Sequence, residues 1–429
     1  MAGLGLLTLL AILPSLIGSD CETNDTTSCS PPSSQIILFF FSLYLVALAQ
    51  GGHKPCTPAF GADQLDGDDP EDCKAKSSFF NWWYFGVCAG AFVTMAIVSY
   101  IQENLSWALG FAIPCIAMVI ALAVFLLGST TCRNRRRAPS TIATEVEVLP
   151  HSSSEQYKFL DKALMVPYPL KEDGWTCSVA EVEEAKAVLR LVPIWGACLI
   201  YGILFAQSRT FFTKQGATME RTIVSSFQIP AASLQCFISI ALLTFIPIYD
   251  RVFVPFARAF TKKPSGITTL QRIGAGTFIS IFTMIIAAVV EIKRLKTAEE
   301  YNLVDKPDVT IPMSVWWMLP QYMLFGITDV LVLVGLQEFF YDQVPTELRS
   351  IGLALYLSIS GVGSYLSSFL VSVIEKSTGG SGQDSWFSNN LNRGHLDYFY
   401  WLLAGLSAVG FAAYFHFARS PIYNRRGTI

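Results

Sequence analysis

The chain has 429 residues, of which 52% are hydrophobic and only 15% are charged. A soluble domain carries about 25% charged residues, so this composition argues against a soluble globular protein. The formal net charge of −3 provides no broad positive field that would attract nucleic acid.

Ten apolar blocks predict membrane-spanning helices, because each is close to the ~20 residues that an α-helix needs to cross a bilayer. Strands of a membrane β-barrel would be about ten residues long and strictly alternating, and these blocks are neither. The blocks lie at approximately residues 2–18, 35–53, 79–101, 107–128, 188–207, 227–248, 270–291, 315–340, 350–374 and 398–418. We therefore expect an all-α polytopic membrane protein.

The first block could alternatively be the apolar region of a signal peptide, but no Lys or Arg precedes it and no Ala-x-Ala-like site follows it. The polar loop after this block holds the sequon Asn24-Asp25-Thr26, with Asn24 as a candidate glycosylation site. Cys21 and Cys29 share the same loop. They could form a disulfide in an oxidising compartment or remain free thiols.

The Lys and Arg residues concentrate in loops on one side of the membrane, and the positive-inside rule places that side, with both termini, in the cytosol. The strongest run is Arg133-Asn134-Arg135-Arg136-Arg137, whereas the first two outer loops contain no Lys or Arg. The run Lys293-Arg294-Leu295-Lys296 is an exception, since it is predicted to lie in an outer loop.

A polar stretch at residues 129–186 divides the chain into four blocks before it and six after it. We predict a partial N-terminal helical bundle at 1–128, a cytosolic central loop at 129–186 and a six-helix bundle at 187–429. A loop between two helical bundles is the layout of major facilitator transporters, which are built from halves of six helices each. The first half here is two helices short of that layout.

Six local sequences point to one family. They are Gly51-Gly52-His53-Lys54-Pro55 leading to Ala59-Phe60-Gly61-Ala62-Asp63-Gln64, Phe79-Phe80-Asn81-Trp82-Trp83-Tyr84, Gln228-Ile229-Pro230, Tyr249-Asp250-Arg251, Leu270-Gln271-Arg272-Ile273-Gly274, and Gln337-Glu338-Phe339-Phe340-Tyr341-Asp342. They resemble signatures of the proton-dependent oligopeptide transporters of the major facilitator superfamily, most closely the plant nitrate/peptide transporter branch. The ten blocks correspond in order to that family's helices three to twelve.

The resemblance implies a secondary transporter that moves small solutes, such as peptides, nitrate or other plant metabolites, by alternating access. Protons are the expected coupling ion, and no other cofactor is expected. A small-molecule substrate and the lipid bilayer are the expected partners, and the plasma membrane or the vacuolar membrane is the expected location.

Two ionisable residues are the first candidates for the substrate or proton pathway, because such groups are costly inside a membrane. The resemblance implies that Lys54 faces the central cavity, although a lysine at a helix end could instead extend to the membrane interface. It also implies that Glu338 lines the cavity and titrates. The alternative for Glu338 is a structural ion pair.

Three further residues are candidates for the same pathway. Asp329 precedes Glu338 by nine residues, so the two lie on roughly opposite sides of one helix, and we expect Asp329 to bond a neighbouring helix. Gln207 could be a pocket amide or an interhelical contact. Phe205 stands where nitrate-binding relatives carry a histidine, which argues against nitrate bound in that way.

Five charged residues at predicted cytosolic loop ends are candidates for a conformational gate. They are Asp63, Asp250, Arg251, Glu347 and Arg349. In this architecture such charges are expected to pair differently in the inward-open and outward-open states. The alternative is that they are simply solvated loop charges.

The family's Glu-x-x-Glu-Arg motif for proton coupling occurs in none of the blocks, so an N-terminal truncation is expected. The alternative function is therefore a truncated, non-transporting membrane isoform or interaction protein. An in-frame helix with the motif upstream in the gene would favour the transporter. We expect neither an enzyme nor a metal site, because His53, His151, His395 and His416 form no cluster suited to catalysis.

Overall fold

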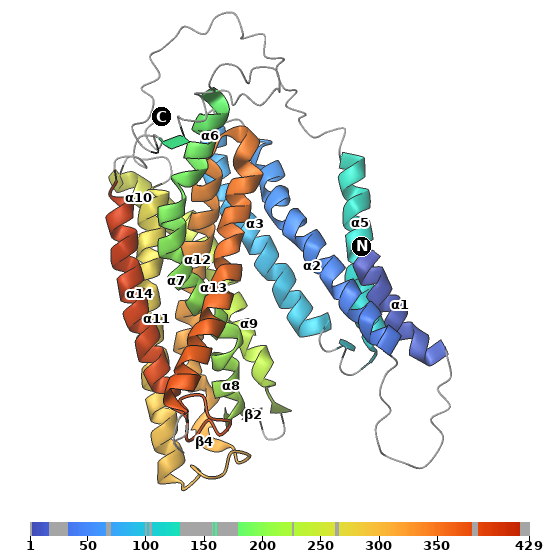
Figure 1. Ribbon diagram of the computed structural model, residues 1–429, viewed down its shortest axis with the longest axis vertical. Coiled ribbons are helices and arrows are strands. Elements are labelled where there is room, and N and C mark those ends of the chain that lie inside the picture. The colour runs from blue at the N-terminus through green and yellow to red at the C-terminus, as the bar shows by residue number, and fades with distance from the viewer. Residues whose placement is uncertain are drawn as a thin grey trace, which may run out of the picture. The chain divides into compact units, whose positions relative to one another are not determined.

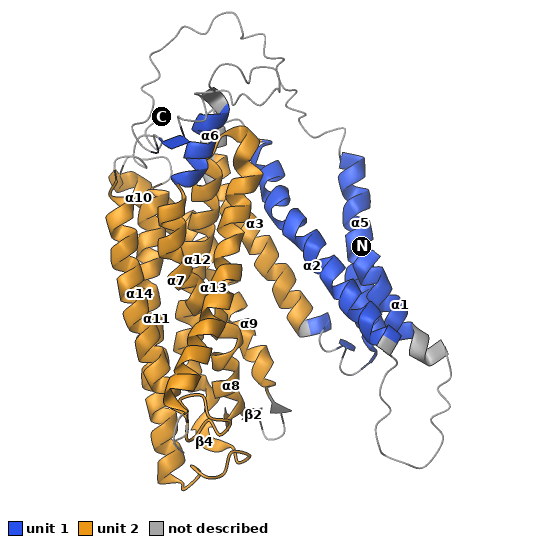
Figure 2. Cartoon of the chain, in the orientation of Figure 1, with its two compact units in different colours: residues 1–64, 97–190 blue, residues 65–96, 191–429 orange. Residues whose placement is uncertain are grey.

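The computed structural model describes residues 2–16, 33–65, 70–98, 101–102, 105–128, 157, 159–160, 179–224, 227–261, 266–379 and 385–420. Almost all of the regular structure is helical (Figure 1). The chain divides into two compact units (Figure 2): unit 1 comprises residues 1–64 and 97–190, and unit 2 comprises residues 65–96 and 191–429.

Among its described residues, unit 1 contains four α-helices, which are α1 (Ala2–Leu16), α2 (Ser33–Ala62), α5 (Trp107–Gly128) and α6 (Val179–Leu189). Helix α1 packs against both α2 and α5. Gly3 makes the close approach to α2 possible, because a Cβ at this position would lie 2.7 Å from Val46 and 2.9 Å from the carbonyl oxygen of Ser42. Small residues bring helices close together inside membranes in this way.

Unit 2 contains the larger bundle. Its helices are α3 (Pro70–Val93), α7 (Val192–Arg209), α8 (Phe211–Ala217), α9 (Cys236–Ile248), α10 (Val254–Thr261), α11 (Thr269–Glu300), α12 (Leu319–Asp342), α13 (Arg349–Thr378) and α14 (Leu396–Ala418). The π-helical turn η4 (Tyr249–Phe253) joins α9 to α10. Helix α12 is the central element and packs against α3, α9, α11 and α13.

In the part of the chain that the structure describes, four short strands lie in the loops of unit 2. Strand β1 (Met219–Glu220) pairs in parallel with β4 (Ile311–Ser314). Strand β2 (Thr222–Val224) pairs antiparallel with β3 (Phe227–Gln228). Since β1 follows α8 and β4 precedes α12, the first pair ties two interhelical loops together at one end of the bundle.

Most of each predicted block is helical where the structure describes it, so the all-α polytopic fold class is confirmed. The block at 227–248 begins in strand β3 and becomes helical from Ala231. Among the described residues, eight helical segments are long and apolar enough to cross a membrane. Helices α1 and α3 account for the other two blocks. Block length was predictable because hydropathy is a local property and bilayer thickness fixes the length of helix that is needed.

One predicted loop segment is wrong. The run Lys293-Arg294-Leu295-Lys296, expected in an outer loop, lies in the last turns of α11. The helix can continue through this run because Arg294 is fully buried and forms an ion pair with Glu291, one turn earlier. Helix α3, which falls in the predicted N-terminal bundle, packs with α9 and α12 and belongs to unit 2.

Helices α7 and α13 pack through a glycine contact. A Cβ on Gly363 would overlap the backbone of Gly202, and a Cβ on Gly202 would overlap the carbonyl oxygen of Ile359. Two helices therefore approach here with no side chain between them, as small residues allow in membranes.

Gly363→Ala is expected to destabilise the protein by about 1–3 kcal/mol, because the added methyl group must push the two helices apart. The measurement is the thermal unfolding temperature in detergent. Gly361 is the matched control in the same helix, since a Cβ there meets no atom within 4 Å. Equal unfolding temperatures for Gly363→Ala and Gly361→Ala would contradict the proposed contact.

Candidate functional site

Helix α12 carries both carboxylates that were predicted for the pathway. Of its most apolar 18-residue window, 83% is buried inside the protein. A helix that is buried on nearly all sides must direct its polar side chains at neighbouring helices. Asp329 and Glu338 are both buried, with 2% and 8% of their surface exposed.

Asp329 lies in a cluster of hydroxyl groups. Its Oδ1 accepts a hydrogen bond from the Tyr201 hydroxyl of α7. Tyr84 of α3, Tyr356 of α13 and the thiol of Cys88 lie close enough to interact with the carboxylate electrostatically. The contact with Tyr201 joins two helices, as the interpretation of Asp329 as an interhelical hydrogen-bond partner requires.

Asp329 has no cation in direct contact. Within the part of the chain that the structure describes, no Lys, Arg or His nitrogen lies within 4.0 Å of its carboxylate, and Arg209 acts on it only at longer range. An ionised carboxylate without a cation is costly to bury. Protonation removes that cost, so this position is chemically suited to take up and release a proton.

Glu338 has a different environment. Its Oε2 lies 3.7 Å from Nη1 of Arg272 on α11, and both side chains are buried. Arg272 also donates hydrogen bonds from Nη2 to Asn81 Oδ1 at 2.7 Å and to the Val330 carbonyl at 2.9 Å. Its guanidinium lies over the Tyr249 ring, 4.3 Å from the centroid. The ion pair that was the alternative for Glu338 is therefore present in the structure.

The same network continues to Asp250 in the turn η4. Asn81 of α3 donates from Nδ2 to Asp250 Oδ1 at 3.0 Å. Ser78 and Trp82 of α3 donate to Asp250 Oδ2 at 2.8 and 3.0 Å. We call Glu338, Arg272, Asn81 and Asp250, with these two donors, the Arg272 network. It links α3, η4, α11 and α12 through charge-assisted hydrogen bonds, which are stronger than neutral ones.

Other charged side chains gather at the same end of unit 2. Lys76 of α3 forms an ion pair with Asp342 of α12 at 2.6 Å. Lys76 and Arg349 both lie over the Tyr341 ring, 4.7 and 4.5 Å from its centroid. Arg251 lies 5.3 Å from the Trp82 ring centroid.

The remaining gate candidates are more dispersed. Glu347 is exposed in the short helical turn η6 (Thr346–Leu348). Asp63, just after α2, belongs to unit 1 and is half-buried. The structure therefore brings Asp250, Arg251 and Arg349 of the five candidates into contacts with side chains of the α3 and α12 ends.

Two candidates from α7 contact other helices. Gln207 is fully buried and donates from Nε2 to Ile203 O at 2.9 Å and to Ser367 Oγ of α13 at 2.8 Å. This geometry matches the interhelical alternative for Gln207. Phe205 stacks on Phe325 of α12 with centroids 6.3 Å apart, and the guanidinium of Arg209 lies 5.1 Å from its centroid.

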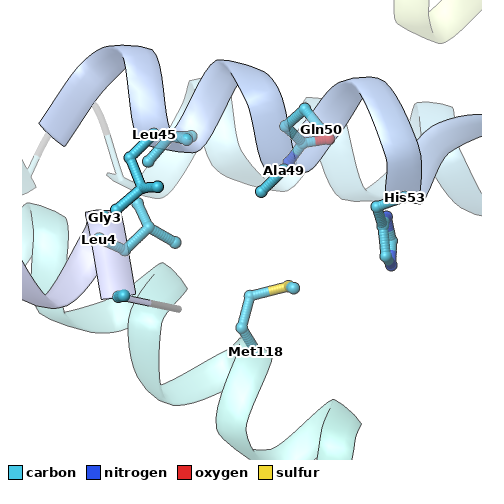
Figure 3. Close-up of a pocket in the computed structure, with 9 residues that line it drawn as sticks. Gly3, Leu4, Leu45, Ala49, Gln50, His53 and Met118 are labelled. Carbon is cyan, nitrogen blue, oxygen red and sulfur yellow. The ribbon is translucent and has the colours of Figure 1, made fainter. Parts of the chain in front are cut away.

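Lys54 is exposed on α2 in unit 1. The preceding residue, His53, lines an apolar pocket of about 280 Å³ between α1, α2 and α5. Figure 3 shows His53 and Gln50 on α2 near this pocket, with Leu4 and Met118 from the other two helices. Asn24, Cys21 and Cys29 lie outside the described residues.

A second buried ion pair lies near the end of α11. Arg294 is bidentate to Glu291, with Nε to Oε2 at 2.9 Å and Nη2 to Oε1 at 2.6 Å. Neither side chain has exposed surface. Arg294 also donates to Asn392 Oδ1 at 2.7 Å and to the Leu391 carbonyl at 2.9 Å. It therefore fixes the loop before α14 to α11.

Sequence reasoning did not single out Arg272, Asn81, Tyr201 or Arg294 as site residues. Arg272 and Glu291 could have been found, because each is a charge within or at the edge of an apolar block. Tyr201 and Asn81 gave no such signal. Among the described residues, no group of three or more His, Cys, Asp or Glu side chains is arranged to hold a metal ion.

Comparisons with known proteins identify relatives of this chain. A family model described as the POT family matches residues 1–387. Protein NRT1/ PTR FAMILY 5.10 of Arabidopsis thaliana is 58% identical over 454 residues, covering 100% of this chain and 80% of that protein. Protein NRT1/ PTR FAMILY 5.12 of the same plant is 54% identical over 451 residues, covering 98% and 78%.

Two solved structures are similar in fold. The POT family transporter PepTSo aligns with a TM-score of 0.59 and 20% identity, covering 98% of this chain and 83% of that one. An auto-inhibited POT family peptide transporter aligns with a TM-score of 0.58 and 19% identity, covering 99% and 81%. At these identities the likeness concerns the fold alone.

Proposed function

The chain belongs to the POT family of transporters, and from that premise we propose that it is a proton-coupled secondary transporter of small solutes that works by alternating access. It is an integral, multi-pass membrane protein and a transporter rather than an enzyme. The observation that carries the proposal is the pair of buried carboxylates on α12, which differ in their partners.

The two carboxylates suit different parts of a transport cycle. Glu338 faces the buried cation Arg272, so its carboxylate has a partner of opposite charge. Asp329 is buried against hydroxyl groups, and its charged form is costly there. We infer that Asp329 is the better candidate to bind the transported proton, and that Glu338 sets the position and charge of the Arg272 network.

The chemistry around Asp329 bears on the substrate class. One carboxylate and the hydroxyls of Tyr84, Tyr201 and Tyr356 surround this position. Phe205 supplies no hydrogen-bond donor for an anion. This set suits a solute with an ammonium group or several hydrogen-bond donors better than a bare anion such as nitrate, so peptides and amine-bearing plant metabolites are the first substrates to test.

The alternating-access step requires contacts that can break. The ion pair between Lys76 and Asp342 is partly exposed, with 19% and 40% of the side-chain surfaces accessible. Exposed pairs contribute about 0–1 kcal/mol, so this contact can open at little cost. We propose that it and the Asp250 contacts with α3 change between the two states.

The direct test is uptake into proteoliposomes that contain the purified chain, screened across peptides, nitrate and plant metabolites with and without an inward proton gradient. A substrate whose accumulation rises as the outside pH falls would support the proposal. Absence of gradient-driven uptake for every substrate class would contradict it and would favour a non-transporting membrane protein.

Glu338→Gln is expected to lower uptake by about tenfold and to weaken its dependence on pH, because the buried Arg272 would lose its only carboxylate partner within 4.0 Å among the described residues. Uptake by the variant is measured at several outside pH values. Glu299→Gln, at an exposed site on α11, is the matched control. If uptake by Glu338→Gln depended on pH in the same way as uptake by the unaltered chain, a coupling role for Glu338 would be excluded.

A further inference from the structure

A groove on unit 2 runs between the first turns of α11 and the last turns of α14, which pack side by side (Figure 1). Its volume is about 630 Å³. It is distant in the chain from the Asp329 cluster and shares no residue with it. The residues that line it are Thr268, Leu270, Gln271, Gly274, Ala275, Phe278, Phe411, Tyr414, Phe415, Ala418 and Arg419.

The walls of the groove form a continuous series of aromatic rings. The Phe278 and Phe411 centroids are 5.5 Å apart, and those of Phe411 and Phe415 are 6.0 Å apart. Phe278 and Phe415 are 47% and 46% exposed. Because both helices are membrane spans, these exposed rings face lipid, and the groove is open to an acyl chain.

The two helices are joined along the groove. The Tyr414 hydroxyl donates a hydrogen bond to the Leu270 carbonyl at 2.8 Å. Gly274 has no side chain, and a Cβ there would lie 3.4 Å from the Tyr414 ring. Tyr414 is buried and therefore fills the space below the groove, so the groove is a fixed feature of the α11–α14 contact.

One end of the groove is polar and positive. Arg419 is exposed there, and its guanidinium lies 4.1 Å from the Phe415 ring centroid. Within the described part of the chain, no carboxylate lies within ion-pair distance of Arg419. Thr268, the N-cap of α11, and Gln271 lie at the same end, and the start of a helix favours an anion through its dipole.

The surrounding sequence adds charge of the same sign. Arg425 and Arg426 follow Arg419 within seven residues, and Lys262 and Lys263 precede α11. The positive-inside rule places this end in the cytosol, where the leaflet carries anionic lipids. Basic sites between membrane helices on this side bind anionic lipid headgroups.

We propose that this groove binds one anionic phospholipid, with an acyl chain along Phe278, Phe411 and Phe415 and the phosphate at Arg419. The division of the groove into an apolar length and one cationic end matches the two parts of such a lipid. A protein partner or a second copy of the chain would need a broad surface, whereas the residues of this groove come from the ends of two helices and the two residues that cap them.

The first test compares an anionic and a zwitterionic phospholipid that carry the same acyl chains. The purified full chain in detergent is offered equal amounts of phosphatidylinositol and phosphatidylcholine with identical acyl chains, and native mass spectrometry counts the lipid retained. The unaltered chain is expected to retain phosphatidylinositol preferentially. Arg419→Gln is expected to lower that preference about fivefold, whereas Lys376→Gln, at the far end of α13, leaves it unchanged. Equal preferences in the two variants would overturn the proposal.

The second test separates the groove from surface charge. Ala275→Leu, which fills the groove without changing charge, is expected to lower retention of both lipids. Ala412→Leu, an exposed alanine of α14 outside the groove, is the control. A photoreactive acyl chain on phosphatidylinositol is expected to label peptides of α11 and α14. Labelling elsewhere, or dimers that form without lipid and block the groove, would overturn the assignment.

Discussion

Asp329→Asn is expected to abolish the stimulation of uptake by an inward proton gradient, a loss of at least about tenfold. Asparagine keeps the shape of the side chain and an oxygen that accepts the Tyr201 hydrogen bond, but it cannot take up a proton. Exchange of labelled for unlabelled substrate needs no net proton movement, so it is expected to persist. Both rates are measured in the same proteoliposomes.

Two further variants serve as comparisons for Asp329→Asn. Asp305→Asn changes a carboxylate whose side chain is 74% exposed and pairs with Arg393, and it is expected to leave the proton response intact. Glu338→Gln is expected to affect exchange as well as driven uptake, because it acts through the position of Arg272. If Asp329→Asn retained its full response to the gradient, the proton would have to bind elsewhere.

Arg294→Met is expected to destabilise the protein by about 3–5 kcal/mol, the range found when one partner of a buried ion pair is removed. Glu291 would be left as an ionised carboxylate with no exposed surface and no cation. The free energy of unfolding is measured by chemical denaturation in detergent, with the thermal unfolding temperature as a second readout.

The double variant Glu291→Leu with Arg294→Met distinguishes the ion pair from the surrounding contacts. Replacing a whole buried pair by apolar side chains is often neutral, so the double variant is expected to recover at least half of the lost stability. Arg393→Gln removes an exposed pair with Asp305 and should cost only about 0.2–1 kcal/mol. A double variant less stable than Arg294→Met alone would show that the hydrogen bonds of Arg294 to Asn392 and Leu391 dominate.

Family and fold could be read from the sequence, because the motifs are local and the spans follow from hydropathy. The resemblance to the plant nitrate/peptide transporter branch is confirmed by relatives at 58% and 54% identity. The partners of the site residues could not be read in the same way. Arg272 and Asn81 are 191 residues apart in the chain, and Tyr201 and Asp329 are 128 apart.

The error at Lys293-Arg294-Leu295-Lys296 has the same origin. Counting positive charges treats each one as solvated, whereas Arg294 is neutralised by a carboxylate one turn away. Likewise, Glu338 was ranked above Asp329 from the residues that flank each of them in the chain. Arg272 could not enter that comparison, because it approaches Glu338 from another helix. Burial and pairing, rather than sequence position, separate the two carboxylates.

Helix α11 carries both buried arginines, and this constrains how it can move. Arg272 and Arg294 are 22 residues apart on a helix without proline, which corresponds to about 33 Å along its axis. The hydrocarbon core of a bilayer is about 30 Å thick. The two arginines are therefore separated by about the thickness of that core. A shift of α11 along the membrane normal would move one of the two charges into hydrocarbon. Glu291 would move together with Arg294 because both lie on α11, whereas Arg272 would be separated from Glu338 on α12. We therefore expect α11 to pivot in place rather than slide.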